Sequence, residues 1–247
     1  FDDPRLPVAV IGFCAGGRAQ TKLNFEELGF STAAYIREAQ RLGLADVGDA
    51  EHTAFIPAYD QKIPQLHTKK KKELGLRTAR WALKTVYGME DISWESADLA
   101  SAVPEGDKIL VTFDTAVFPY DMGSLIEGFA VADASGNYFM AQAEVIAVKE
   151  KDMRNMQILV SSRLVKEPVS VRYAWARSPM GNLKVEGKPW QPLHSFRTDQ
   201  WDFSAEVTHS DPDGRQKNSE AIKERRNQVK ACLARRLEED ERARGKK

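Results

Sequence analysis

Cysteine, long apolar runs and net charge are all scarce in this sequence. Only two cysteines occur among the 247 residues, Cys14 and Cys232, which excludes a disulfide-stapled scaffold and a cysteine-rich zinc site. Lys plus Arg and Asp plus Glu each number 36, so the surface has no overall field that attracts nucleic acid or an anionic membrane. No apolar run approaches the roughly 18 residues that span a bilayer. We therefore expect no nucleic-acid partner and no membrane span.

The start of the chain has neither a secretory signal pattern nor an initiating methionine, because the first residue is Phe1. We therefore expect a processed protein or a piece of a longer one. The composition, with 42% hydrophobic and 29% charged residues, is that of an ordinary globular protein. The length suffices for one large domain or two smaller ones.

Residues 1–90 have the pattern of an α/β domain. The apolar run 8–11 (VAVI) is followed at once by 12–17 (GFCAGG), which is typical of a parallel strand that is covered on both faces. The spacing of apolar residues predicts helices over 35–44 and 68–87, and Gly88 ends the second. A strand, a glycine turn and helices in this order indicate α/β structure.

Residues 91–203 predict an antiparallel, sandwich-like β domain with almost no helix. Apolar and polar residues alternate over 109–113 and 169–175, and residues 134–137 (ASGN) predict a hairpin turn. We expect one face of a strand to bury four side chains: Val169, Val171, Tyr173 and Trp175.

Residues 204–247 form a highly charged tail. From Ala205 onward there are twelve Lys or Arg and nine Asp or Glu, with a narrow apolar stripe that includes Val229 and Leu233. Two interpretations remain open. The tail is either an amphipathic helix that packs on the body or on a partner, or a frayed, solvated segment.

Three late motifs resemble the end of the sialate O-acetylesterase family. They are residues 171–176 (VRYAWA), 178–183 (SPMGNL) and 195–199 (SFRTD). Residues 66–75 (LHTKKKKELG) are similar to the IHPKNKQEVG segment of that family, and 107–114 and 125–136 resemble two of its strands. The resemblance extends over about residues 7–201, and the charged tail has no counterpart in it.

The resemblance implies an SGNH-type hydrolase, with a flavodoxin-like α/β domain and an attached β domain. Such enzymes remove O-acetyl groups from sialic acids or other acetylated carbohydrates with a serine, a histidine and usually an aspartate, and need no cofactor. The family's GQSN-like serine block and its QGES-like block are both missing here. The chain therefore resembles the C-terminal part of such an enzyme, with an upstream half of the same protein as its partner. An extracytoplasmic location (periplasmic, secreted or lysosomal) follows from the resemblance alone.

His67 matches the catalytic histidine of the family. It precedes a predicted helix, whose positive end and neighbouring lysines favour the neutral imidazole that a general base requires. The alternative is a surface residue at the start of a helix. Gln65 stands where the family has the acid, so Asp60 is the nearest upstream partner, unless it only caps its loop.

The glycine loop 12–17 allows three interpretations. Cys14 in G-x-C-x-G-G is similar to the nucleophile of dienelactone hydrolases, because a thiol at a helix N-terminus has a lowered pKa. Too few residues separate Cys14 from His67 for that fold, however. Gly16 or Gly17 can instead bring a backbone N–H to an oxyanion. The third interpretation is tight strand–helix packing.

Two further hypotheses concern ligands. Trp190, between Pro189 and Pro192, is the better candidate for a sugar platform, whereas Tyr173 and Trp175 belong to a core. His194 and His209 have no companions at metal-ligand spacing. His52 has Asp49 and Glu51 nearby, but three such residues on one loop are usually solvated, so we predict no metal. The sequence thus favours a carbohydrate O-acetylesterase that lacks its serine. The alternatives are a non-catalytic carbohydrate-binding or interaction module and a hydrolase that uses Cys14.

Overall fold

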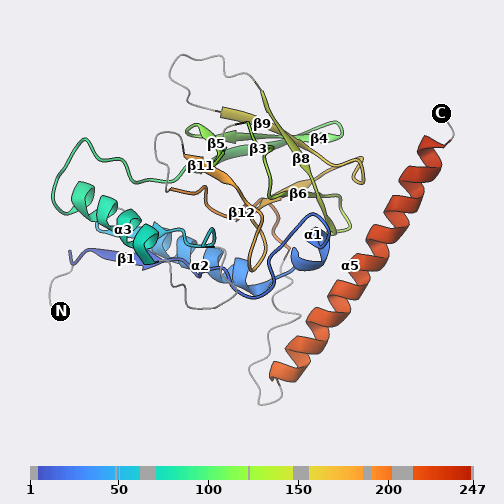
Figure 1. Cartoon of the computed structure of the whole chain (residues 1–247), viewed down its shortest axis with the longest axis horizontal. Helices are drawn as coiled ribbons and strands as arrows, with labels where there is room; N and C mark the ends of the chain where they lie inside the picture. Colours follow the sequence, from blue (N-terminus) through green and yellow to red (C-terminus); the bar gives the residue numbers. More distant parts are fainter. Residues whose placement is uncertain are drawn as a thin grey trace.

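The computed structural model describes residues 5–47, 49, 51–61, 71–121, 123–146, 156–185, 191–201 and 214–245, with the backbone alone for 214–218. An α/β part comes first, then a β part, and a long helix lies along one side (Figure 1). The predicted change from α/β to β texture near residue 90 is visible in the order of elements. The division into separate domains stays a prediction.

The α/β part contains two parallel strands with helices beside them. Strands β1 (Val8–Ile11) and β2 (Thr53–Ile56) pair in parallel, with Val8 opposite Thr53. Helices α1 (Phe25–Leu28) and α2 (Thr32–Val47) lie between the two strands in the chain, and α3 (Lys71–Thr85) follows β2. Helix α3 packs Trp81 against Ala54 and Ile56 of β2, because its apolar residues recur at helical spacing.

Strand β1 is not the covered strand that its sequence predicts. Val8 and Ile11 are each 45% exposed, and in the described part of the chain β1 pairs with β2 alone. The apolar run therefore forms a strand as expected, but it lies at the edge of the sheet.

The β part contains two four-stranded antiparallel sheets and a two-stranded one, and no helix occurs in its described residues. The first sheet has the order β3 (Leu99–Glu105), β4 (Lys108–Phe113), β9 (Met156–Ser161), β8 (Gln142–Ile146). The second has the order β12 (Phe196–Arg197), β10 (Ser170–Tyr173), β6 (Phe129–Ala132), β7 (Tyr138–Met140). The short pair joins β11 (Leu183–Val185) to β5 (Val117–Pro119).

Both large sheets contribute to one hydrophobic core. Ile109, Val111 and Phe113 of β4 lie in the same buried cluster as Val171 and Tyr173 of β10. Their burial confirms the predicted alternation of apolar and polar residues along these strands.

Val169 and the turn at residues 134–137 test two further predictions from the sequence. Val169 is 51% exposed, because β10 begins only at Ser170, so the prediction for this residue was wrong. The turn at residues 134–137 is present between β6 and β7, with Gly136 at a φ of +72°, a conformation that suits glycine.

In its described residues, 214–245, the charged tail is a continuous helix rather than a frayed segment. Helix α5 (Gly214–Arg244) lies against α1 in Figure 1 and packs Val229, Cys232 and Leu233 onto the body. Arg236 donates to Asp133 at 2.5 Å and to the Leu164 carbonyl at 2.8 Å. Charged contacts supply the part of the interface that the narrow apolar stripe does not cover. No described helix is long and apolar enough to cross a bilayer.

The α/β part is fixed to the β part by buried polar contacts. Arg37 of α2, only 2% exposed, donates to the carbonyls of Ala174 and Ala176 at 3.2 and 2.6 Å. The Tyr59 hydroxyl donates to the Leu193 carbonyl at 2.6 Å. Buried donors that find backbone acceptors favour one relative placement of the two parts.

Candidate functional site

Asp60 lies in the loop that follows β2 and is held by a buried arginine of α3. Arg77 donates to both carboxylate oxygens, at 2.8 and 2.5 Å, and also to the Pro57 carbonyl at 2.6 Å. Tyr120 of the β part donates to Asp60 Oδ2 at 3.2 Å. The side chains of Arg77 and Asp60 are 2% and 11% exposed. Asp60 is therefore more than a loop cap, because it joins β2, α3 and the β part.

The electrostatics of this cluster follow from burial and from the carboxylate. Burial alone lowers the pKa of Arg77, but its hydrogen bonds and attraction to Asp60 outweigh that effect and raise the pKa. Burial, with the nearby Asp60 charge, raises the pKa of Tyr120 far above its usual range. At neutral pH Arg77 is therefore a cation and Tyr120 a neutral phenol.

Cys14 lies near this cluster but lacks the environment of an activated thiol. Burial and the Asp60 charge raise its pKa, against a smaller lowering by Arg77. No helix begins at Cys14, because α1 starts only at Phe25. The expected lowering by a helix N-terminus is thus absent, and the thiol is held in its less nucleophilic, protonated form.

The three glycines of the loop have different surroundings. A Cβ at Gly12 would lie 2.5 Å from the Phe55 ring, so glycine leaves room there for the ring to pack against β1. Gly16 is buried. Gly17 is exposed, has a φ of +70°, and lies near the side chain of Arg177. Tight packing explains Gly12, whereas the oxyanion role of Gly16 or Gly17 stays a prediction.

Three predicted site residues fall outside the described part of the chain. His67 and Gln65 belong to residues 62–70, and Trp190 belongs to residues 186–190. Their roles as base, orienting group and sugar platform stay predictions. Asp60 and Arg77 lie on either side of residues 62–70 in the sequence, so their ion pair ties the two flanks of the segment that carries His67.

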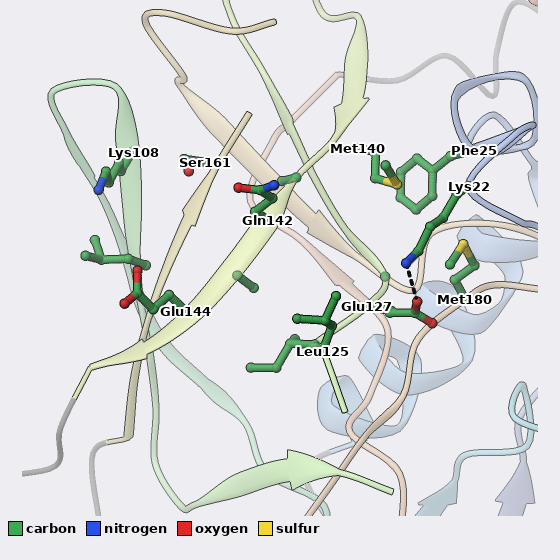
Figure 2. A pocket seen from close by; sticks show the side chains of 15 residues that line it. Lys22, Phe25, Lys108, Leu125, Glu127, Met140, Gln142, Glu144, Ser161 and Met180 are labelled. Atoms are coloured by element: carbon green, nitrogen blue, oxygen red, sulfur yellow. Dashed lines mark ion pairs between the residues drawn. The ribbon is translucent and has the colours of Figure 1, made fainter. Parts of the chain in front are cut away.

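A pocket of about 540 Å³ opens beside Asp60. Its lining comes from the loop after β2, from the segment after β5 and from the residues just before β11. The lining residues are Asp60, Tyr120, Asp121, Ser124, Leu125, Glu127, Gly181 and Asn182. A second pocket of about 530 Å³ shares Leu125 and Glu127 with it, so the two adjoin. Figure 2 shows the second pocket, where Lys22 and Glu127 form an ion pair at 3.2 Å.

The late sequence motifs have structural roles behind these pockets. Arg172 of the first motif and Asp199 of the third form a buried bidentate pair, with both distances at 2.8 Å. The guanidinium of Arg172 lies 4.0 Å from the centre of the Tyr138 ring. Spacing within strands does not predict this pair, because its members are brought together only when β10 pairs with β12.

The middle motif fixes the loop that the two pockets share. Asn182 accepts a hydrogen bond from the Glu127 amide at 2.9 Å and donates to the Leu125 carbonyl at 2.9 Å. A Cβ at Gly181 would lie 2.7 Å from the Ala174 side chain, so glycine is required there. The Tyr173 hydroxyl accepts from the Leu183 amide at 2.7 Å. The motif therefore shapes the pocket walls.

Comparison with known proteins gives one informative likeness. No protein-family model matches the chain, and no curated protein matches it. A crystal structure of a carbohydrate acetylesterase from Xanthomonas citri matches with 26% sequence identity and a TM-score of 0.65. The match covers 81% of this chain and 42% of that one. The fold is thus similar to that of a carbohydrate acetylesterase, and the chain spans about two-fifths of its length.

Proposed function

We propose that this chain is part of a carbohydrate O-acetylesterase of the sialate O-acetylesterase type, with an SGNH-like α/β domain and a sandwich-like β domain. The observation that carries the proposal is the likeness to the Xanthomonas citri acetylesterase. Because that likeness covers less than half of the longer protein, the serine nucleophile is assigned to sequence beyond these 247 residues. An extracytoplasmic location belongs to the same proposal.

The exposed edge of β1 supports the assignment of further sequence to the fold. The amides of Val8 and Gly12 donate to the carbonyls of His52 and Ile56, each at 2.8 Å. Because successive residues of a strand point to opposite edges, the amides of Ala9 and Ile11 face away from β2. An apolar strand of this kind normally has a neighbour on both sides. A parallel strand from the serine-bearing segment is proposed to pair there.

The proposed chemistry divides the roles as follows. The serine attacks the acetyl carbonyl, His67 accepts its proton, and backbone amides stabilise the oxyanion. Asp60 acts as a positioning residue, because its pair with Arg77 ties the flanks of the His67 segment. A nucleophilic Cys14 is not favoured, because burial raises the pKa of the thiol.

The test compares two proteins from the same gene, this chain and the longer product that includes the upstream coding sequence. Both are treated with a fluorophosphonate probe for activated serines and are assayed for acetate release from acetylated oligosaccharides. Only the longer protein is expected to be labelled and to release acetate. Labelling and turnover by the 247-residue chain would contradict the proposal, as would a longer product that does neither.

A further inference from the structure

A row of polar side chains crosses the solvent face of the first β sheet. Lys108 of β4, Ser161 of β9 and Gln142 of β8 lie directly opposite one another in register. Their neighbours Ile109 and Val160 point the other way and are buried in the core. Because side chains alternate along a strand, the row faces outward, and Figure 2 shows it at one end of the second pocket.

These polar side chains are available to a ligand. Glu144 lies two residues along β8 from Gln142, on the same face. No side-chain hydrogen bond or ion pair joins Lys108, Ser161, Gln142 or Glu144 to another residue that the structure describes. Together they offer donors from an ammonium, a hydroxyl and an amide, and acceptors from a hydroxyl, an amide and a carboxylate. Such a mixture matches the hydroxyl groups of a sugar.

The opposite end of the pocket combines apolar side chains with the Lys22–Glu127 ion pair. Phe25, Met140 and Met180 lie there in Figure 2, and Leu125 forms part of the wall toward the Asp60 pocket. A sugar ring has C–H faces as well as hydroxyl groups, so it can contact this wall while its hydroxyls reach the polar row. The volume of about 530 Å³ is within the range of small-molecule sites.

The charge of the pocket beside Asp60, where the acetylated unit is expected, disfavours an anionic sugar. The second pocket has two lysines and two glutamates, and Lys22 is already paired with Glu127. The Asp60 pocket has three carboxylates and no cation among its described lining residues, and Arg77 behind it is held by Asp60. A sialic acid carboxylate in the Asp60 pocket would meet like charges, because no cation is among the described residues that line it.

We infer that the two adjoining pockets bind a neutral, partly O-acetylated oligosaccharide rather than a sialic acid. The unit that carries the acetyl group lies in the pocket beside Asp60, and the next units extend past Leu125 to the row Lys108, Ser161 and Gln142. The inference rests on the proposed function and adds the substrate class and a second subsite.

The experiment measures binding, which needs no serine and therefore separates this inference from the esterase proposal. The 247-residue chain, displayed on streptavidin to gain avidity, is applied to an array of neutral and sialylated oligosaccharides with and without O-acetyl groups. Calorimetry on the tightest neutral ligand then compares the unmodified chain with Gln142→Ala. Gln157→Ala is the matched control, since Gln157 lies on the same face of β9 but outside the pocket.

Neutral oligosaccharides are expected to bind, and sialylated ones are not. Gln142→Ala should weaken binding about fivefold, the effect of one lost hydrogen bond, whereas Gln157→Ala should leave it unchanged. Melting temperatures of both variants check that the fold is intact. Preference for sialylated ligands, binding of no neutral oligosaccharide, or equal effects of the two substitutions would each overturn the inference. None of these results would bear on whether the longer protein releases acetate.

Discussion

Removal of the Asp60 carboxylate should unfold the candidate site rather than only impair a reaction. In Asp60→Ala, the guanidinium of Arg77 keeps the Pro57 carbonyl but loses both hydrogen bonds to the carboxylate. The Arg77 side chain is 2% exposed, so its charge loses the carboxylate in a largely buried position. Breaking a buried pair by removing one member costs about 3–5 kcal/mol. For a chain of this size, each kcal/mol lowers the melting temperature by about 2–4 °C.

Urea unfolding of the 247-residue chain, followed by circular dichroism, measures this loss. Asp121→Ala is the control, because Asp121 lines the same pocket but is exposed, and its removal should change stability by less than about 0.5 kcal/mol. A loss below about 1 kcal/mol in Asp60→Ala would refute the structural role. The carboxylate would then be free to serve a catalytic one.

Three further predictions concern other parts of the molecule. Burial lowers the pKa of His194 to about 3, from 6.5 for a free imidazole, so between these pH values only the unfolded chain binds this proton. The free energy of unfolding therefore falls as the pH is lowered through this range. His194→Phe removes this titrating group, so the decrease in unfolding free energy between about pH 7.5 and pH 5, measured in urea titrations, should become about 1 kcal/mol smaller. The expected figure is modest because the residue is partly exposed, and an unchanged decrease would contradict this. Gly128→Ala should cost about 2 kcal/mol or more in urea unfolding, because its Cβ would lie 2.6 Å from a backbone carbon, whereas Gly75→Ala, in open space on α3, should gain about 0.5–1 kcal/mol; equal effects would refute the packing argument. Iodoacetamide should modify Cys14 more slowly than free cysteine at about pH 7, because its pKa is raised; rapid modification would restore it as a candidate nucleophile.

Local patterns predicted those features of the fold that depend on neighbouring residues. The strand at 8–11, the helix that ends before Gly88 and the turn at 134–137 follow from apolar spacing and glycine. Tyr173 and Trp175 are buried as expected. Short-range patterns do not tell whether a strand has one neighbour or two, which explains the error on the environment of β1.

The polar contacts that position the site were not predictable from the sequence. In the sequence, Arg37 resembles a solvated residue on a helix, yet its side chain donates to carbonyls more than a hundred positions away. The partners of Asp60 are an arginine on α3 and a tyrosine after β5. Charged residues form such pairs only when the tertiary fold excludes water, so neither spacing nor composition indicates them. Asp60 was a candidate in the sequence, but Arg77 was not.

The central claim is that this chain supplies the histidine base of a serine acetylesterase. The most direct measurement is kcat/KM of the longer protein on one acetylated oligosaccharide, with and without His67→Ala. We expect His67→Ala to lower kcat/KM about 10³-fold or more, because serine is a poor nucleophile without its base. Activity within about tenfold of the unmodified protein would place the base elsewhere and contradict the account.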